Sequence, residues 1–196
     1  MDGFPLNQNK DNVLGCDLRS GYIKEGYALY GDGPTSESPT PIRFFTDDIF
    51  DITPSPDDTT TTDSVAAPDE RLSLKALLGK VEFIHTGLLF HLFNEETQVA
   101  LAERLVMLLN TSFEEGRSKE VVVFGCHQGL EVAGYIVSDV PRYRYGHSPT
   151  SWASMWKSVF KRKYDEEWVE RHVTIEAKTG ERRGISVPLF WSVTVR

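Results

Sequence analysis

Residues 79–109 constrain the fold of this chain most, because a strand signal there leads directly into a helix signal. The apolar run 81–84 is bounded by glycines and predicts a strand that is buried on at least one face. Asn94 can then cap a helix, and apolar side chains recur at helical spacing as far as Leu109. A buried strand followed by an amphipathic helix is typical of α/β folds.

Polar side chains lie between this strand and this helix. His85 and Thr86 directly follow the strand, and His91 precedes the helix. Open α/β sheets bind ligands in a crevice outside the carboxyl ends of their strands. The sequence therefore predicts a functional site around these three residues.

The same alternation continues along the chain. Further strands are predicted at 12–18, 42–46 and 121–124, the last ending in a glycine-containing turn at 125–129. Alternating residues over 168–177 and 185–195 predict a closing antiparallel hairpin. The predicted fold class is α/β, with a mostly parallel sheet, flanking helices and the hairpin at an antiparallel edge.

Two of the flanking helices can be described in more detail. Residues 21–30 are expected to turn several apolar side chains towards the sheet, namely Tyr22, Ile23, Tyr27 and Leu29. Ser148 and Pro149 are typical of a helix cap and first position. The helix after them carries an apolar stripe, Trp152, Met155, Trp156 and Phe160, which is typical of core.

Composition limits the architecture and the function class. Residues 1–196 are expected to form one domain with a flexible insertion at 54–70, a stretch rich in threonine and poor in apolar residues. A net charge of -8 argues against binding to nucleic acid or an anionic membrane surface. No run reaches the ~18 apolar residues of a membrane span. Cys16 and Cys126 lie in apolar runs without metal-ligand spacing, so we expect reduced, buried thiols, no metal and a cytoplasmic location.

Acidic residues end two of the predicted strands. Asp17 ends the first strand, where a carboxylate can accept both hydroxyls of a ribose, or simply lie in solvent before the next helix. Asp48 and Ile49 follow the second strand and can hold the amino group and the ring face of a base, or form a solvated turn. The residues alone leave both alternatives open.

Six blocks of the chain resemble a family of fungal class I methyltransferases, which use S-adenosylmethionine and act on secondary metabolites. The blocks are NVLGCDLRSGYIKEGYALYGD, RFFTDDIFDI, EFIHTGLLFHLFNEETQVALAERLVMLL, VVVFGCHQG, YRYGHSPTSWASMW and ISVPLFWSVTV. The most specific of them are FHLFNEETQ, within the third, and GHSPTSW, within the fifth. The resemblance implies a Rossmann-like sheet, S-adenosylmethionine as cofactor and a small-molecule polyketide or terpenoid substrate.

The resemblance also assigns residues to the cofactor. Asp17 and the adjacent Leu18 match the ribose-binding position, and Asp48 and Ile49 match the block that holds the adenine. His85 and Thr86 follow the strand whose end faces the methionyl group and the methyl acceptor.

Methyl transfer is an in-line displacement, which needs the donor and acceptor atoms held about 3–3.5 Å apart. A neutral imidazole can assist by taking the proton of a phenol or enol. The catalytic candidates are His85, His91 and His147. His91 is equally explained as a core or helix-start side chain, and His147 as part of a helix cap.

One unit of the family pattern is absent, namely a first strand with a glycine-rich turn of the form DLGCGxG. We therefore expect exposed apolar side chains at 13–14, 44–45 and 81–84, and self-association into a dimer or larger species. Two other functions stay open. One is an enzyme on the same scaffold that guides a cyclisation or isomerisation without methylating, and the other is a non-catalytic partner subunit.

Overall fold

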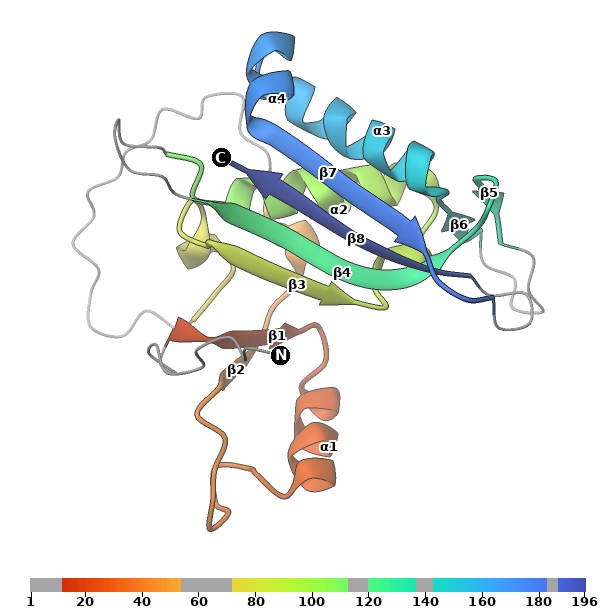
Figure 1. Cartoon of the computed structure of the whole chain (residues 1–196). Coiled ribbons are helices and arrows are strands. Elements are labelled where there is room, and N and C mark those ends of the chain that lie inside the picture. The colour runs from red at the N-terminus through yellow and green to blue at the C-terminus, as the bar shows by residue number, and fades with distance from the viewer. Residues whose placement is uncertain (1–11, 54–71, 113–119, 137–142, 183–186) are drawn as a thin grey trace, which may run out of the picture. The chain divides into compact units, whose positions relative to one another are not determined.

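The computed structural model describes residues 12–53, 72–112, 120–136, 143–182 and 187–196. The insertion predicted at 54–70 lies outside these ranges. The chain divides into two compact units, Met1–Ala76 and Leu77–Arg196, and each is described by itself. Figure 1 labels their helices and strands.

The first unit contains one parallel strand pair. β1 (Leu14–Asp17) pairs with β2 (Arg43–Thr46), so that Asp17 lies opposite Thr46. α1 (Ser20–Tyr30) connects the two strands and ends at Gly31, whose φ of 66° is the left-handed conformation that glycine adopts most easily. The strands agree with their predicted positions.

The apolar side of α1 is less covered than predicted. No residue of α1 is buried. Tyr22 and Leu29 are exposed, whereas Tyr27 is half-buried and makes an edge contact with Phe44, with ring centroids 5.6 Å apart. The predicted packing of Tyr22 and Leu29 on the sheet is wrong, because a pair of four-residue strands offers too little surface to cover a whole helix face.

The second unit contains a four-stranded mixed sheet in the order β3-β4-β8-β7. Its strands are β3 (Phe83–Gly87), β4 (Val121–Gly129), β7 (Val173–Thr179) and β8 (Val187–Val195). β3 and β4 are parallel, and β8 runs antiparallel to both of its neighbours. The predicted closing hairpin is therefore confirmed.

Strand bounds in this unit differ from the prediction. β3 begins two residues later, so His85 and Thr86 lie within the strand, in its last three residues. β4 continues to Gly129 rather than turning at 125, because its pairing with β8 extends to the residue opposite Val187. A Cβ at Gly129 would lie 2.8 Å from both the His147 carbonyl oxygen and Leu189 Cβ. The glycine is thus needed for close backbone packing and not for a turn.

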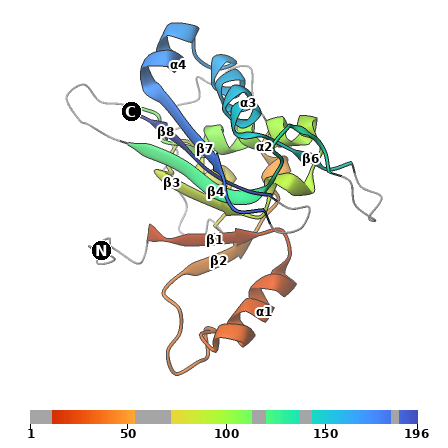
Figure 2. The same cartoon turned by 45° about the vertical axis from the view of Figure 1, so that its right-hand side comes forward.

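Helices α2 (Glu95–Leu108), α3 (Pro149–Lys161) and α4 (Glu166–His172) lie on one face of this sheet (Figures 1 and 2). Asn94 caps α2, with Oδ1 accepting from the backbone N–H of Thr97 at 2.9 Å, as predicted. Ser148 caps α3 in a reciprocal capping box, and Pro149 occupies its first position. The predicted stripe of α3 is buried, and the residues of β8 alternate between buried and less buried positions, so the core lies between the helices and the sheet.

The expected exposure of apolar side chains is confirmed at several positions. Val13 and Phe44 are exposed in the first unit, and Phe83 is 63% exposed in the second. Cys126 is half-buried, but Cys16 is exposed, so its predicted burial is wrong. Within the described ranges, every helix is too short or too polar to cross a membrane.

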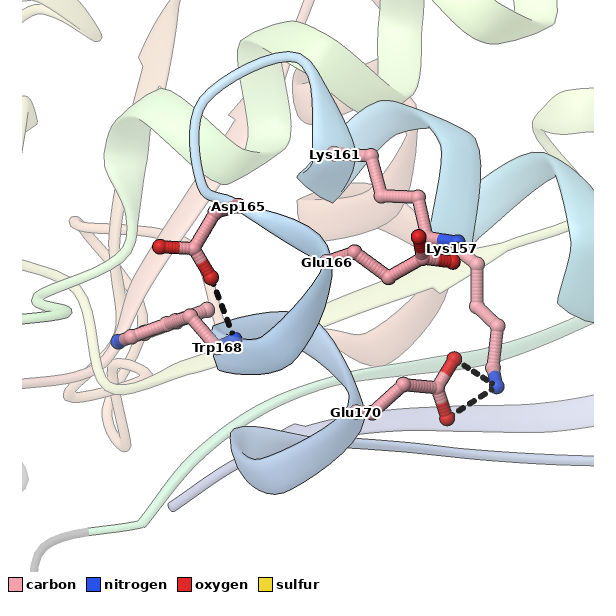
Figure 3. Close-up of polar contacts among 6 residues, drawn as sticks. All are labelled: Lys157, Lys161, Asp165, Glu166, Trp168 and Glu170. Carbon is pink, nitrogen blue, oxygen red and sulfur yellow. Dashed lines mark hydrogen bonds and ion pairs between the residues drawn. The ribbon is translucent and has the colours of Figure 1, made fainter.

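α4 replaces the first part of the strand predicted at 168–177. Asp165 begins this helix, because its Oδ1 accepts from the backbone N–H of Trp168 at 2.8 Å. Figure 3 shows this cap beside two ion pairs that join α4 to α3, Lys157–Glu170 and Lys161–Glu166. The side chain of a cap accepts a hydrogen bond from a backbone N–H at the helix start that has no partner within the helix. The alternation of apolar and polar side chains, which predicts a strand here, does not reveal such a cap.

We expect the cap to matter more for stability than the neighbouring ion pairs. Asp165→Ala should lower the free energy of unfolding by about 1 kcal/mol, since it leaves a helix-start N–H without its partner. Glu170→Ala should cause a smaller loss, because exposed ion pairs are screened by solvent. Urea denaturation measures both variants. An equal loss for Glu170→Ala would contradict this ranking.

Candidate functional site

The two acids predicted to bind a nucleoside lie at the same end of the β1–β2 pair. Asp17 is the last residue of β1, and its Oδ1 accepts from the backbone N–H of Arg19 at 2.7 Å. Asp48 lies two residues beyond β2 and caps the short 3-10 helix η2 (Ile49–Asp51), accepting from Phe50 N at 2.9 Å. The parallel register thus brings both strand-end acids together within the first unit.

The neighbours of these acids differ in exposure. Leu18 is exposed directly after β1, and Ile49 is half-buried as the first residue of η2. A shallow hollow of about 410 Å³ also lies in this unit, between α1 and the loop that follows it. Its lining residues are Lys24, Tyr27, Ala28, Gly31, Gly33, Pro34, Thr35 and Ser36, and none of the predicted site residues contributes to it.

In the second unit, the predicted residues of β3 point to opposite faces of the sheet. His85 is exposed, and its ring contacts that of Phe124 with centroids 5.1 Å apart. Thr86 is buried, and its hydroxyl finds no hydrogen-bond partner among the described residues. Leu88, just beyond β3, has a φ of 54°, which is rare for a non-glycine residue, and its N–H is bonded to Cys126 O at 2.8 Å. Such strained positions concentrate at functional sites.

The FHLFNEETQ and GHSPTSW blocks meet at the carboxyl ends of β3 and β4. The helical turn η4 (Phe90–Leu92) follows β3, and the Tyr145 N–H of β6 (Tyr145–Gly146) donates to Phe93 O at 3.0 Å. Gln98 is fully buried, and its Nε2 donates to Phe93 O at 3.1 Å and to Tyr145 O at 2.8 Å. Phe90 of the first block also contacts Trp152 of the second, with ring centroids 4.8 Å apart, so the two most specific blocks form one packed cluster.

Three histidines line this cluster. His91 of η4 is half-buried, and its ring is nearly parallel to that of His127, with centroids 6.4 Å apart. His127 of β4 is 2% exposed, and its Nδ1 accepts from Trp191 Nε1 at 3.0 Å. His147 is 1% exposed, with Nδ1 at 3.0 Å from Ser151 Oγ.

Two of the residues in this cluster were not predicted. The predicted turn at 125–129 includes His127, and the sequence pattern singles out neither His127 nor Gln98 as a functional residue. The only sequence signal for either residue is its place inside a block of the family resemblance.

Burial keeps these imidazoles neutral. It lowers the pKa of His127 to about 3, with smaller contributions from His91 and His147. It also lowers the pKa of His147 to about 4. The pKa of His91 is lowered first by burial and then by the Arg144 guanidinium. At neutral pH all three rings can therefore donate one hydrogen bond and accept another.

Metal ligands are not gathered in this part of the chain. Among the residues that the structure describes, no group of three or more His, Cys, Asp or Glu side chains is placed to hold a metal ion.

Comparison with known proteins places this geometry in a context. No known family profile matches the chain. Over 152 residues it is 28% identical to O-methyltransferase phiE of a fungal species (Fungal sp.), covering 76% of this chain and 41% of the relative. It is 26% identical over 158 residues to methyltransferase adrK of Penicillium rubens, covering 81% and 46%. The chain thus spans less than half the length of these curated relatives.

A solved structure with a similar fold is the 1,6-didemethyltoxoflavin-N1-methyltransferase of Burkholderia thailandensis, crystallised with 1,6-didemethyltoxoflavin and S-adenosylhomocysteine. The TM-score is 0.54 at 8% identity, over 94% of this chain and 61% of that one. The chain has the Rossmann-like fold of class I methyltransferases. At this identity the likeness concerns the fold alone, and the predicted fold class is confirmed.

The buried histidines predict a loss of stability in acid. A ring whose pKa lies near 3 or 4 when folded, and near 6.5 when unfolded, binds its proton mainly in the unfolded chain between those values. The free energy of unfolding should therefore fall as the pH drops below about 6.5, with about 1.4 kcal/mol per pH unit from each ring. Urea titrations between pH 7.5 and 4.5 measure this slope.

A variant can isolate the contribution of His147. His147→Asn keeps an amide near the Nδ1 position for the contact with Ser151 and removes the titrating ring. We expect a shallower slope than in the parent chain, because one of the two rings that bind a proton on unfolding is removed. An equal slope for His147→Asn and the parent would contradict the assignment.

Proposed function

We propose that this chain is an S-adenosylmethionine-dependent methyltransferase that acts in the cytoplasm on a small-molecule secondary metabolite of the polyketide or terpenoid class. The observation that carries the proposal is its similarity to fungal methyltransferases over 76–81% of its length, together with the class I methyltransferase fold. A further relative, the asnovolin E/chermesin D methyltransferase nvfJ of Aspergillus novofumigatus, is 26% identical over 161 residues.

The acids of the first unit suit the nucleoside part of the cofactor. In the proposal, Asp17 accepts hydrogen bonds from the ribose hydroxyls and Leu18 lies against the nucleoside, while Asp48 accepts from the adenine amino group and Ile49 covers the ring. The support is that Asp17 ends β1 and Asp48 lies two residues beyond the neighbouring parallel strand β2, at the end of the strands where ligands of open α/β sheets bind. Carboxylates are also strong acceptors for hydroxyl and amino donors. The bound cofactor supplies an electrophilic methyl group.

The carboxyl end of β3 suits the acceptor molecule and the methionyl part. Thr86 has a buried hydroxyl without a described partner, and His91 is half-buried and neutral. We place His85, Thr86 and His91 next to the methyl acceptor, where the protein orients the acceptor oxygen and excludes water. His147 lies behind them, fully buried against the cap of α3. Its role in the proposal is to support the site rather than to touch the substrate.

Calorimetry with S-adenosylhomocysteine tests the proposal. The chain should bind this product, and Asp17→Asn should weaken binding by about 1–3 kcal/mol, because it removes a charged acceptor without changing shape. Glu37→Gln, an exposed acid of the same unit, is the matched control and should bind like the parent.

The outcomes of this titration separate the alternatives. Equal affinity for Asp17→Asn and the parent would refute the ribose assignment. No heat with a folded parent chain would refute the methyltransferase proposal, in favour of an enzyme on the same scaffold without methyl transfer, or of a partner subunit.

Self-association is a second part of the proposal. Phe83, Phe124 and Phe190 are exposed, and the strand register places them on the same face of the sheet. Among the described strands, β3 pairs with β4 alone. Open edges and apolar patches of this kind promote association.

Light scattering should therefore show a dimer or larger species. Phe83→Asp should shift the chain towards a monomer, since it places a charge in the patch. Val132→Asp adds the same charge at a position that is exposed outside this patch, and should leave the size unchanged. A monodisperse monomer of the parent chain would contradict this part of the proposal.

A further inference from the structure

The contact between Trp191 and His127 determines which nitrogen of His127 carries its hydrogen. The indole Nε1 of tryptophan is a donor only. Because it lies 3.0 Å from Nδ1 of His127, that ring nitrogen must be the acceptor. A neutral imidazole has one N–H, so the hydrogen of His127 is on Nε2. That Nε2–H is buried and has no hydrogen-bond partner among the described residues.

Three more buried ring nitrogens beside His127 have no described partner. They are Nδ1 of His91, Nε2 of His147 and Nε1 of Trp152. The four rings are neighbours: the centroid of Trp152 lies 4.6 Å from that of His127 and 5.3 Å from that of His147, and His91 lies parallel to His127. A buried polar atom without a partner costs about 1–3 kcal/mol, so four in one place call for a common explanation.

The four nitrogens divide into donors and acceptors. His127 Nε2–H and Trp152 Nε1–H are donors. The single hydroxyl hydrogen of Ser151 can go to Ser148 O at 3.2 Å or to Nδ1 of His147 at 3.0 Å. With this hydrogen on Ser148 O, Nδ1 of His147 donates to Ser151 and Nε2 of His147 is an acceptor. Nδ1 of His91 can then be the second acceptor. Two donors and two acceptors match the four hydrogen bonds of a single water molecule.

We propose that His127 is a positioning residue for His91, and that it acts through a buried water held by these four ring nitrogens. The water accepts from His127 and Trp152 and donates to His91 and His147. The bond to Nδ1 places the hydrogen of His91 on Nε2, the nitrogen that is not among the buried, unpartnered atoms. The Arg144 guanidinium also acts on His91 electrostatically and lowers the pKa of its ring.

This inference rests on the proposed function for its consequence in catalysis. His91 would meet the methyl acceptor as a hydrogen-bond donor and not as a base. An acceptor oxygen that reaches the site with its proton already lost to solvent would take this bond with one lone pair and keep another directed towards the methyl group that the cofactor would supply. His127 and Trp191 would then orient the acceptor without touching it.

The tautomer of His91 is measurable without substrate or cofactor. We would label the histidines of the full chain with ¹⁵N and record long-range proton–nitrogen correlations at pH 7. The expected result for both His91 and His127 is a protonated Nε2 and an unprotonated Nδ1. Because the spectrum is recorded on the free protein, its result does not depend on the result of the calorimetric test of cofactor binding.

Variants then separate positioning from simple packing. His127→Phe keeps an aromatic ring but removes the donor, and should shift both His91 nitrogens towards the averaged values of a mixed tautomer. His172→Phe, at the end of α4, should leave the His91 signals unchanged. If His127→Phe does not fold, the parent spectrum still decides. A protonated Nδ1 on His91 in the parent, or an unchanged His91 spectrum in a folded His127→Phe, would overturn the proposal.

Discussion

The packing of aromatic rings around Phe90 holds the second unit together. Phe90 is fully buried and makes ring contacts with Trp152 at 4.8 Å, Trp191 at 5.7 Å and His127 at 5.7 Å between centroids. These partners come from α3, β8 and β4, and Phe90 itself begins η4. Aromatic pairs contribute about 0.5–1.5 kcal/mol each beyond the burial of their area. Their combined contacts therefore decide where η4 lies, and with it His91.

The same packing imposes an electrostatic constraint. Imidazoles inside an aromatic cluster must stay neutral, since burying a charged ring without a counterion is costly. This constraint makes the stability of the unit depend on pH. It also means that the chemistry of the site depends mainly on which ring nitrogens donate hydrogen bonds and which accept them. A donor such as Trp191 then has influence beyond its packing, because it selects the tautomer of His127.

The residues predicted from the family resemblance and from the chemistry of methyl transfer are distributed over both units. Asp17, Leu18, Asp48 and Ile49 belong to the unit Met1–Ala76, whereas the three catalytic candidates and Thr86 belong to Leu77–Arg196. Asp17 ends β1 and Asp48 follows β2 in the first unit, and His85 and Thr86 lie at the carboxyl end of the parallel strand β3 in the second. The assignment thus rests on the same structural rule twice, although the two groups differ in chemistry, with carboxylates in one and imidazole rings in the other.

The sequence by itself determined the α/β class, the caps at Asn94 and Ser148, the buried stripe of α3 and the closing hairpin, because each depends on local periodicity or on a backbone N–H close in sequence. Tertiary structure alone decided that β4 extends through Gly129, that α4 replaces the start of a strand, and that α1 remains uncovered. It also brought Gln98 and His127 into the site. These outcomes depend on partners far along the chain: Gln98 and Tyr145 are 47 residues apart, and His127 and Trp191 are 64 apart. A local sequence pattern does not show which hydrogen-bond donor from a distant part of the chain will lie against a buried acceptor.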